Sequence, residues 1–164
     1  MRYHKITSPD INSGLGFRVT LWLSGCSLNC KFCHNPETHN PLSGKEFTNE
    51  SMTELLDKLG KPYIKGLTIS GGNPFDSDHQ ELLSLIKIVK EKYPKKDIWI
   101  FSGYTLEESM KDSTLTEILE NIDVLVDGRF DYTKRNVSLA FRGSENQVIW
   151  EKDSSGKFIK SKLN

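Results

Sequence analysis

The sequence has no excess of charge of either sign and no long hydrophobic run. Its 22 lysine and arginine residues balance 22 aspartate and glutamate residues, so no overall field favours nucleic acid or an anionic membrane. The apolar runs are short, and residues 1–10 lack the hydrophobic core of a signal peptide, so we expect neither export nor a membrane-spanning segment. These absences predict a cytoplasmic protein whose partner is neither nucleic acid nor a membrane.

Cysteine is absent outside one short segment. The only three cysteines are Cys26, Cys30 and Cys33. An odd number of thiols in a reducing compartment argues against a disulfide framework and favours metal binding or redox chemistry. Three thiolates so close together can hold a metal centre and leave one metal position without a protein ligand, where a substrate can bind.

The length of the chain sets the scale of the fold. At 164 residues we expect one domain with a single core, too short for a complete eight-unit barrel of about 250 residues. No repeat or low-complexity linker divides the chain. We expect the domain to cover residues 1–150 and to be followed by a solvated, frayed, lysine-rich tail at residues 151–164.

Apolar runs alternate with helical patterns along the chain, an arrangement typical of parallel strands joined by crossover helices. Strands are predicted at residues 19–23, 66–70, 98–101, 124–126 and 147–150. Helices are predicted around residues 52–59, after a capping box at 77–80, and at 106–110 and 115–119. The predicted fold is therefore α/β, a single open sheet or partial (β/α) barrel of mostly parallel strands.

Four loops follow predicted strands and would meet at one edge of such a sheet, where α/β proteins bind ligands. They are the cysteine loop and residues 71–73, 102–104 and 127–129. Ser102, Tyr104 and Asp127 could line a pocket there, although each also suits an ordinary turn or cap.

The cysteine spacing is the strongest signal in the sequence. Cys-x3-Cys-x2-Cys, with the aromatic Phe32 before the last cysteine, resembles the signature of the radical S-adenosylmethionine superfamily. The segments IWIFSGYTLEE, IDVLVDGRF and FRGSENQV resemble, more specifically, the family of proteins that activate anaerobic ribonucleoside-triphosphate reductase. The resemblance extends from the N-terminus to about residue 150.

This resemblance implies an oxidoreductase. Cys26, Cys30 and Cys33 would bind three irons of a 4Fe-4S cluster, and S-adenosylmethionine would chelate the fourth. An electron from the cluster would cleave S-adenosylmethionine to methionine and a 5′-deoxyadenosyl radical, which takes a hydrogen atom from a glycine of the reductase large subunit. The other implied partner is a low-potential electron donor of the flavodoxin or ferredoxin type. The hard chemistry would belong to the cofactors.

The resemblance also implies contacts with S-adenosylmethionine. Backbone groups of Phe32, Cys33, His34 and Gly72 would contact it, and residues 71–73, Gly71-Gly72-Asn73, would lie along its methionine part. The family has an acidic residue at the third of these positions. We expect the carbonyl of Asn73 to accept a hydrogen bond from the amino group, without the strength that a charged acceptor adds.

Two other interpretations remain open at this point. The three cysteines could form a structural zinc site with one histidine, His34 or His39, as the fourth ligand, which would make the chain a zinc-stabilised interaction module. Alternatively, the chain could be another small radical S-adenosylmethionine enzyme with a different substrate. Arg129, Phe130 and Arg142 could dock a partner, but loop residues of these types are more often solvated or packed. We assign no histidine a catalytic role.

Overall fold

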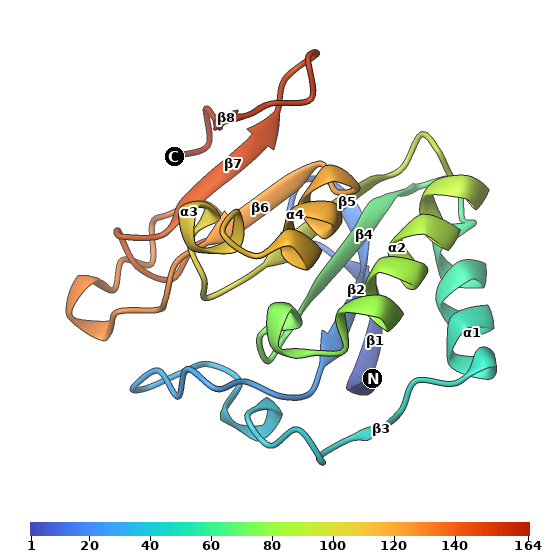
Figure 1. Cartoon of the computed structure of the whole chain (residues 1–164), viewed down its shortest axis with the longest axis horizontal. Coiled ribbons are helices and arrows are strands. Elements are labelled where there is room, and N and C mark those ends of the chain that lie inside the picture. The colour runs from blue at the N-terminus through green and yellow to red at the C-terminus, as the bar shows by residue number, and fades with distance from the viewer.

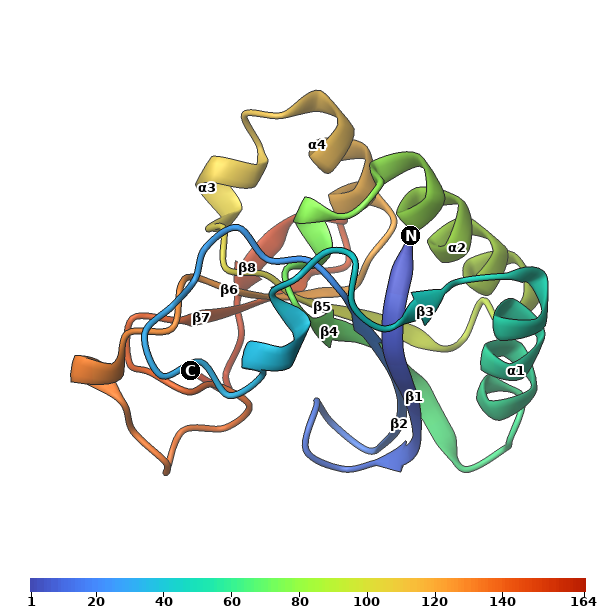
Figure 2. The same ribbon diagram turned by 90° about the horizontal axis from the view of Figure 1, so that it is seen from below.

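The computed structural model describes residues 1–164, which form one mixed sheet with helices packed on one face (Figures 1 and 2). The strands are β1 (Arg2–Asp10), β2 (Phe17–Leu23), β3 (Lys45–Glu46), β4 (Ile64–Gly71), β5 (Asp97–Phe101), β6 (Val124–Asp127), β7 (Val148–Lys152) and β8 (Phe158–Lys160). The helices are α1 (Asn49–Leu59), α2 (His79–Lys92), α3 (Leu106–Ser109) and α4 (Ser113–Glu120), with single 3-10 turns η1 (Pro36–Thr38), η2 (Pro74–Asp76) and η3 (Tyr132–Lys134).

The sheet is open. Its order is β3-β1-β2-β4-β5-β6-β7-β8, so β3 and β8 are its edges. The three central pairings from β2 to β6 are parallel, whereas the four outer pairings are antiparallel. The expected α/β class and open sheet are confirmed, but a barrel is not, and the prediction of mostly parallel strands is wrong. Short connections such as residues 11–16, between β1 and β2, cannot make the crossover that parallel pairing needs.

The central strands and the helices follow the sequence pattern closely. Each predicted strand lies within or overlaps β2, β4, β5, β6 or β7, and each predicted helix corresponds to one of α1 to α4. The N-cap of α2 is Asp78, whose carboxylate accepts hydrogen bonds from the backbone N–H of Gln80 and Glu81. The predicted capping box at residues 77–80 is therefore wrong: the N-cap is Asp78 and not Ser77. The pattern does not predict β1, because only Tyr3 and Asp10 of its nine residues are buried and no apolar alternation marks it.

Residues 151–164 are folded, so the prediction of a frayed tail is wrong. β8 pairs with β7, and the side chain of Asn164 donates to the carbonyl of Ile149 (2.8 Å) and accepts from its N–H (2.9 Å). Four lysines dominate the composition of this segment, and they conceal a strand whose only apolar residues are Phe158 and Ile159.

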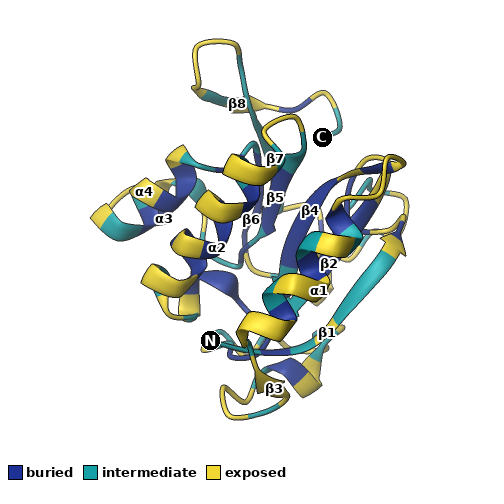
Figure 3. Ribbon diagram, turned by 90° about the vertical axis from the view of Figure 1, so that its right-hand side faces the viewer, coloured by how far each residue is buried: buried dark blue, intermediate teal, exposed yellow.

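The two faces of the sheet differ, because successive side chains of a strand point to opposite sides. Val19, Leu21 and Leu23 of β2 face the helices and join a buried core of 22 residues. Figure 3 shows the inner sides of α1 and α2 buried against this face and their outer sides exposed. Arg18, Thr20 and Trp22 alternate with them, so they face the side that carries no helix.

None of the helices has the length and apolar character needed to cross a membrane.

Candidate functional site

The cysteine loop begins where β2 ends, at the edge where the other parallel strands also end (Figure 1). Backbone hydrogen bonds fix its beginning: Gly25 donates to the carbonyl of Thr38 (2.7 Å) and Cys26 to that of His39 (3.1 Å). The carbonyl of Gly25 accepts from the N–H of Asn73 (2.8 Å) in the loop after β4. The structure thus brings together two of the strand-end loops that the sequence singles out.

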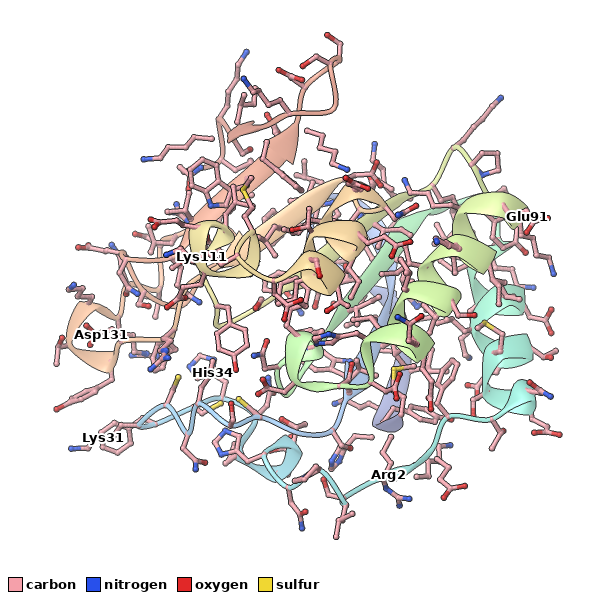
Figure 4. All side chains as sticks on the ribbon, viewed as in Figure 1. Arg2, Lys31, His34, Glu91, Lys111 and Asp131 are labelled. Carbon is pink, nitrogen blue, oxygen red and sulfur yellow. The ribbon has the colours of Figure 1, made fainter.

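The three cysteines are free thiols and partly exposed. The loop that carries them turns sharply, since Asn29 and Phe32 have φ values of 46° and 57°, a left-handed conformation that an aromatic residue rarely adopts. Figure 4 shows Lys31 and His34 on this loop, beside the segment that carries Asp131. No group of three His, Cys, Asp or Glu side chains is close enough to hold a metal ion, so neither the three thiols alone nor the thiols with a histidine form an assembled ligand set here.

The donor set nevertheless fits an iron–sulfur cluster. Thiolates are the ligands that such clusters require, and the three thiols are unpaired on one loop of the sheet edge. Burial raises the pKa of the Cys26 thiol, and hydrogen bonds from the backbone N–H groups of Leu28 and Asn29 lower it in part. The nearby negative charges of Asp76 and Cys33 also raise this pKa. Binding of a metal centre would therefore have to displace a proton from Cys26.

Two glycines allow the loop after β4 to pass under the cysteine loop. A Cβ atom on Gly71 would lie 2.5 Å from the carbonyl oxygen of Leu23, and one on Gly72 would lie 2.2 Å from that of Gly25. Gly71 also has a φ of 104°, which strongly favours glycine. Both residues are therefore required by the crossing of the two loops, whatever else they contact.

Asn73 is buried, with 1% of its surface exposed. Its Oδ1 accepts a hydrogen bond from the hydroxyl of Ser102 (3.1 Å), while its Nδ2 has no partner. Ser102 in turn accepts from the N–H of Tyr104 (3.0 Å). A buried amide nitrogen without a hydrogen-bond acceptor costs free energy. A ligand that places an acceptor near Nδ2 of Asn73 would therefore gain a hydrogen bond.

Asp127 makes its side-chain hydrogen bonds with α3 and β7. Its Oδ2 accepts hydrogen bonds from the N–H of Leu106 in α3 (2.6 Å) and from Nε1 of Trp150 in β7 (2.9 Å). Burial raises the pKa of Asp127, and these donors lower it in part. The contacts of Asp127 are therefore those of a residue that joins α3 to β7.

A cavity of about 560 Å³ opens on the side of the sheet without helices. Strand residues Trp22, Ser70 and Phe101 line it, together with His34 from the cysteine loop and residues of the segment between β6 and β7. Its lining contains no carboxylate. Of the predicted cofactor contacts, only His34 lines this cavity. The sequence does not indicate that Trp22, Ser70 and Phe101 line it, because that depends on the face of the sheet to which each side chain points.

The segment between β6 and β7 closes against the cysteine loop. The rings of His34 and Phe130 lie 5.5 Å apart, and those of Phe32 and Tyr132 lie 5.2 Å apart. Arg142 donates to the carbonyl of Gln147 (3.0 Å) and to Oδ1 of Asn164 (3.2 Å). Phe130 and Arg142 thus have packing roles within the chain, while Arg129 contributes its carbonyl to Asn146 (2.8 Å).

Known proteins resemble the chain over most of its length. The family model described as a 4Fe-4S single cluster domain matches residues 12–150. Anaerobic ribonucleoside-triphosphate reductase-activating proteins are similar to it: that of Enterobacteria phage T4 is 38% identical over 92% of this chain and 94% of its own length. The corresponding protein of Pasteurella multocida (strain Pm70) is 39% identical over 92% of this chain and 97% of its own. That of Vibrio cholerae serotype O1 is 41% identical over 91% and 97%.

Proposed function

Since the chain belongs to the family of anaerobic ribonucleoside-triphosphate reductase-activating proteins, we propose that it activates such a reductase by generating a glycyl radical on it. The observation that carries the proposal is the similarity over some nine-tenths of the chain, combined with three free thiols at the sheet edge. The partner is then the large subunit of the reductase. A cytoplasmic location fits thiols that must stay reduced.

In this proposal Cys26, Cys30 and Cys33 would hold a 4Fe-4S cluster, and one iron would be left without a protein ligand for S-adenosylmethionine. Together these groups would supply a low-potential electron and the carbon-centred radical that abstracts hydrogen from glycine. A flavodoxin or ferredoxin type of protein would deliver the electron. A family model for a single 4Fe-4S cluster supports the iron–sulfur part of this assignment.

The residues of the chain would bind and orient these groups. The loop of Phe32, Cys33 and His34 lies against the segment between β6 and β7, which would help to orient it. Gly71 and Gly72 keep the neighbouring loop close to the cysteines, and Asn73 offers a buried amide to the methionine part of S-adenosylmethionine. Ser102 orients that amide through its hydroxyl, and Tyr104 donates its N–H to Ser102.

An anaerobic assay tests the proposal. Reconstituted protein is mixed with dithionite, S-adenosylmethionine and the reductase, and the products are followed by chromatography and electron paramagnetic resonance (EPR). We expect 5′-deoxyadenosine together with a glycyl radical signal, and neither from the Cys30→Ser variant. Cleavage without the glycyl radical would contradict the choice of partner. A colourless protein that retains zinc and cleaves nothing would contradict the whole assignment.

A further inference from the structure

A hydrogen-bond network ties the cysteine loop to the loops after β4 and β5. Oδ2 of Asp76 accepts from both the N–H (2.7 Å) and the hydroxyl (2.9 Å) of Ser27. Oδ1 of Asp76 accepts from the hydroxyl of Tyr104 (2.7 Å), which also lies 3.2 Å from the hydroxyl of Ser27. We call these three side chains the Ser27 clasp. Asp76 is the last residue of η2, and Tyr104 precedes α3.

Ser27 is the last residue of the cysteine loop that is held in this way. Between residues 28 and 33 the only hydrogen bond from backbone to backbone runs from the N–H of Cys33 to the carbonyl of Cys30 (3.2 Å). The N–H groups of Leu28 and Asn29 face the thiol of Cys26, also within the loop. No side chain of these residues donates to or accepts from another element. The clasp therefore separates a fixed beginning of the loop from a part that other elements hold only through ring and cation–π contacts, such as that of Lys31 with Tyr132.

Packing next to the clasp involves the same loop after β5. A Cβ atom on Gly103 would lie 2.1 Å from Cδ1 of Leu28, so Leu28 sits directly against the backbone of the residue before Tyr104. The loop after β5 thus holds Ser27 through a hydroxyl and Leu28 through a close contact. Both contacts flank the first cysteine on its C-terminal side.

Asp76, the acidic residue of the clasp, makes no other interaction that would explain its charge. Asp76 forms no ion pair with a lysine, arginine or histidine. A carboxylate accepts several hydrogen bonds at once and more strongly than a neutral group, and here both of its oxygens are used to hold neighbouring loops.

We propose that Asp76 and Tyr104 are positioning residues that fix Ser27, and with it Cys26, on the ends of β4 and β5 while residues 29–33 remain free to close around a cluster. The clasp would fix the position of Cys26, the first cluster ligand, and the later part of the loop would change its conformation to bring the other two cysteines to the cluster. The role of the cysteines in this inference rests on the proposed function, but the existence of the clasp does not.

Hydrogen exchange on the metal-free chain tests the clasp alone. Asp76→Ala should raise the exchange rate of the Ser27 amide about fivefold to tenfold, as expected for the loss of one hydrogen bond. Tyr104→Phe should raise it less, because the Asp76 carboxylate still accepts from that amide. Tyr132→Phe is the matched control: its ring packs on the same loop and its hydroxyl makes no hydrogen bond in the chain. Unchanged exchange in Asp76→Ala would overturn the clasp.

Cluster assembly tests the positioning role. In Asp76→Ala we expect slower incorporation of iron and sulfide and an altered EPR spectrum of the reduced protein, with partial rescue in Asp76→Asn, whose amide carbonyl can still accept from Ser27. Faster exchange with an unaltered spectrum and assembly rate would overturn the positioning role. If the unsubstituted chain takes up no iron, the proposed function fails, whereas the exchange result still decides whether the clasp exists.

Discussion

At the scale of single residues, Asn73 is the point at which the structure refines the sequence interpretation most. The expected acceptor, Oδ1, already accepts from Ser102, and the amide nitrogen is the atom without a partner. A carbonyl oxygen has two lone pairs, so Oδ1 can still accept from an amino group, and Nδ2 can in addition donate to a carboxylate. Asn73 can therefore contact both polar groups of an amino acid ligand.

We predict that Asn73→Ala weakens the binding of S-adenosylmethionine about fivefold to tenfold, the loss expected for one or two neutral hydrogen bonds. Titration of the reconstituted protein, followed by the change in its EPR spectrum, measures the affinity. Ser102→Ala, which leaves the amide in place but unoriented, should have a smaller effect. An unchanged affinity in Asn73→Ala would reduce the residue to a turn former.

Arg18 is a second residue whose role only its surroundings reveal. Its side chain is fully buried on the face without helices, with Nη2 2.6 Å from Oδ1 of Asp97. Nε donates to the hydroxyl of Thr68 (2.6 Å), and the guanidinium lies 5.1 Å from the ring centre of Trp99. Burial lowers the pKa of Arg18, and Asp97 raises it again in part.

Arg18→Met should lower the free energy of unfolding by about 3 kcal/mol, the low end of the cost of breaking a buried ion pair, because Arg18 is fully buried but Asp97 is one quarter exposed. Urea unfolding of the metal-free protein measures this loss. Adding Asp97→Asn should recover part of it. The exposed pair of Lys111 and Glu107, 3.0 Å apart, provides the control, since Lys111→Met should change stability little. Equal effects of Arg18→Met and Lys111→Met would refute the argument.

At the scale of elements, the loops after the parallel strands are held by one another. The loop after β4 contacts the cysteine loop through Asn73 and Asp76, and the loop after β5 contacts both through Ser102 and Tyr104. The loop after β6 differs, since its Asp127 is bound to α3 and β7. Its neighbours do reach the other loops, since a Cβ atom on Gly103 would lie 4.0 Å from Cγ of Arg129 and the ring of Phe130 lies beside that of His34. Three of the four loops are thus joined by hydrogen bonds, and the fourth meets them only by packing.

Asp127 makes stability depend on pH in a direction that can be tested. Because burial raises its pKa in the folded state, the folded protein binds this proton more tightly than the unfolded one. Its contribution to the free energy of unfolding should therefore fall as pH rises from the ordinary value of about 4 through the raised pKa, and then level off.

Urea unfolding at a series of pH values, for the unsubstituted chain and for Asp127→Asn, isolates this contribution as the difference between the two curves. The stability of the unsubstituted chain relative to the variant should decline with rising pH across that window. A difference that does not change with pH, or that grows, would show that burial does not raise the pKa.

At the scale of the whole molecule, the core and the cysteine loop are separate. The 22 residues of the main core and the four of the smaller one come from β1, β2, β4 to β7, the helices and their flanks, and none lies between residues 24 and 46. The fold therefore does not depend on a metal in the way that a zinc finger does.

Removal of iron should accordingly leave the chain folded. After anaerobic treatment with a chelator, we expect an unchanged far-ultraviolet circular dichroism spectrum and a cooperative unfolding transition. Faster hydrogen exchange should be confined to the cysteine loop and its neighbours. Global unfolding on chelation would instead support the zinc-stabilised module, in which the metal replaces part of the core.

The sequence by itself determined the features that depend on neighbours along the chain. The spacing of Cys26, Cys30 and Cys33, the apolar runs of β4 and β5, and the helical stripe of α2 are local patterns, and each predicted its element. The cysteine motif and the further segments were also enough to indicate the family. The roles of the site residues in binding cofactors stay predictions.

Tertiary structure alone decided which residues far apart in the sequence meet. The antiparallel outer strands, the folding of residues 151–164 and the clasp between Ser27, Asp76 and Tyr104 depend on pairings between separate segments, from Lys152 with Phe158 to Ser27 with Tyr104. No local periodicity encodes such pairings. Asp127 shows the same limit, because its side chain faces partners in α3 and β7 that its strand-end position does not reveal. Local physics specifies elements, whereas packing and hydrogen bonding between elements select the contacts that each side chain makes.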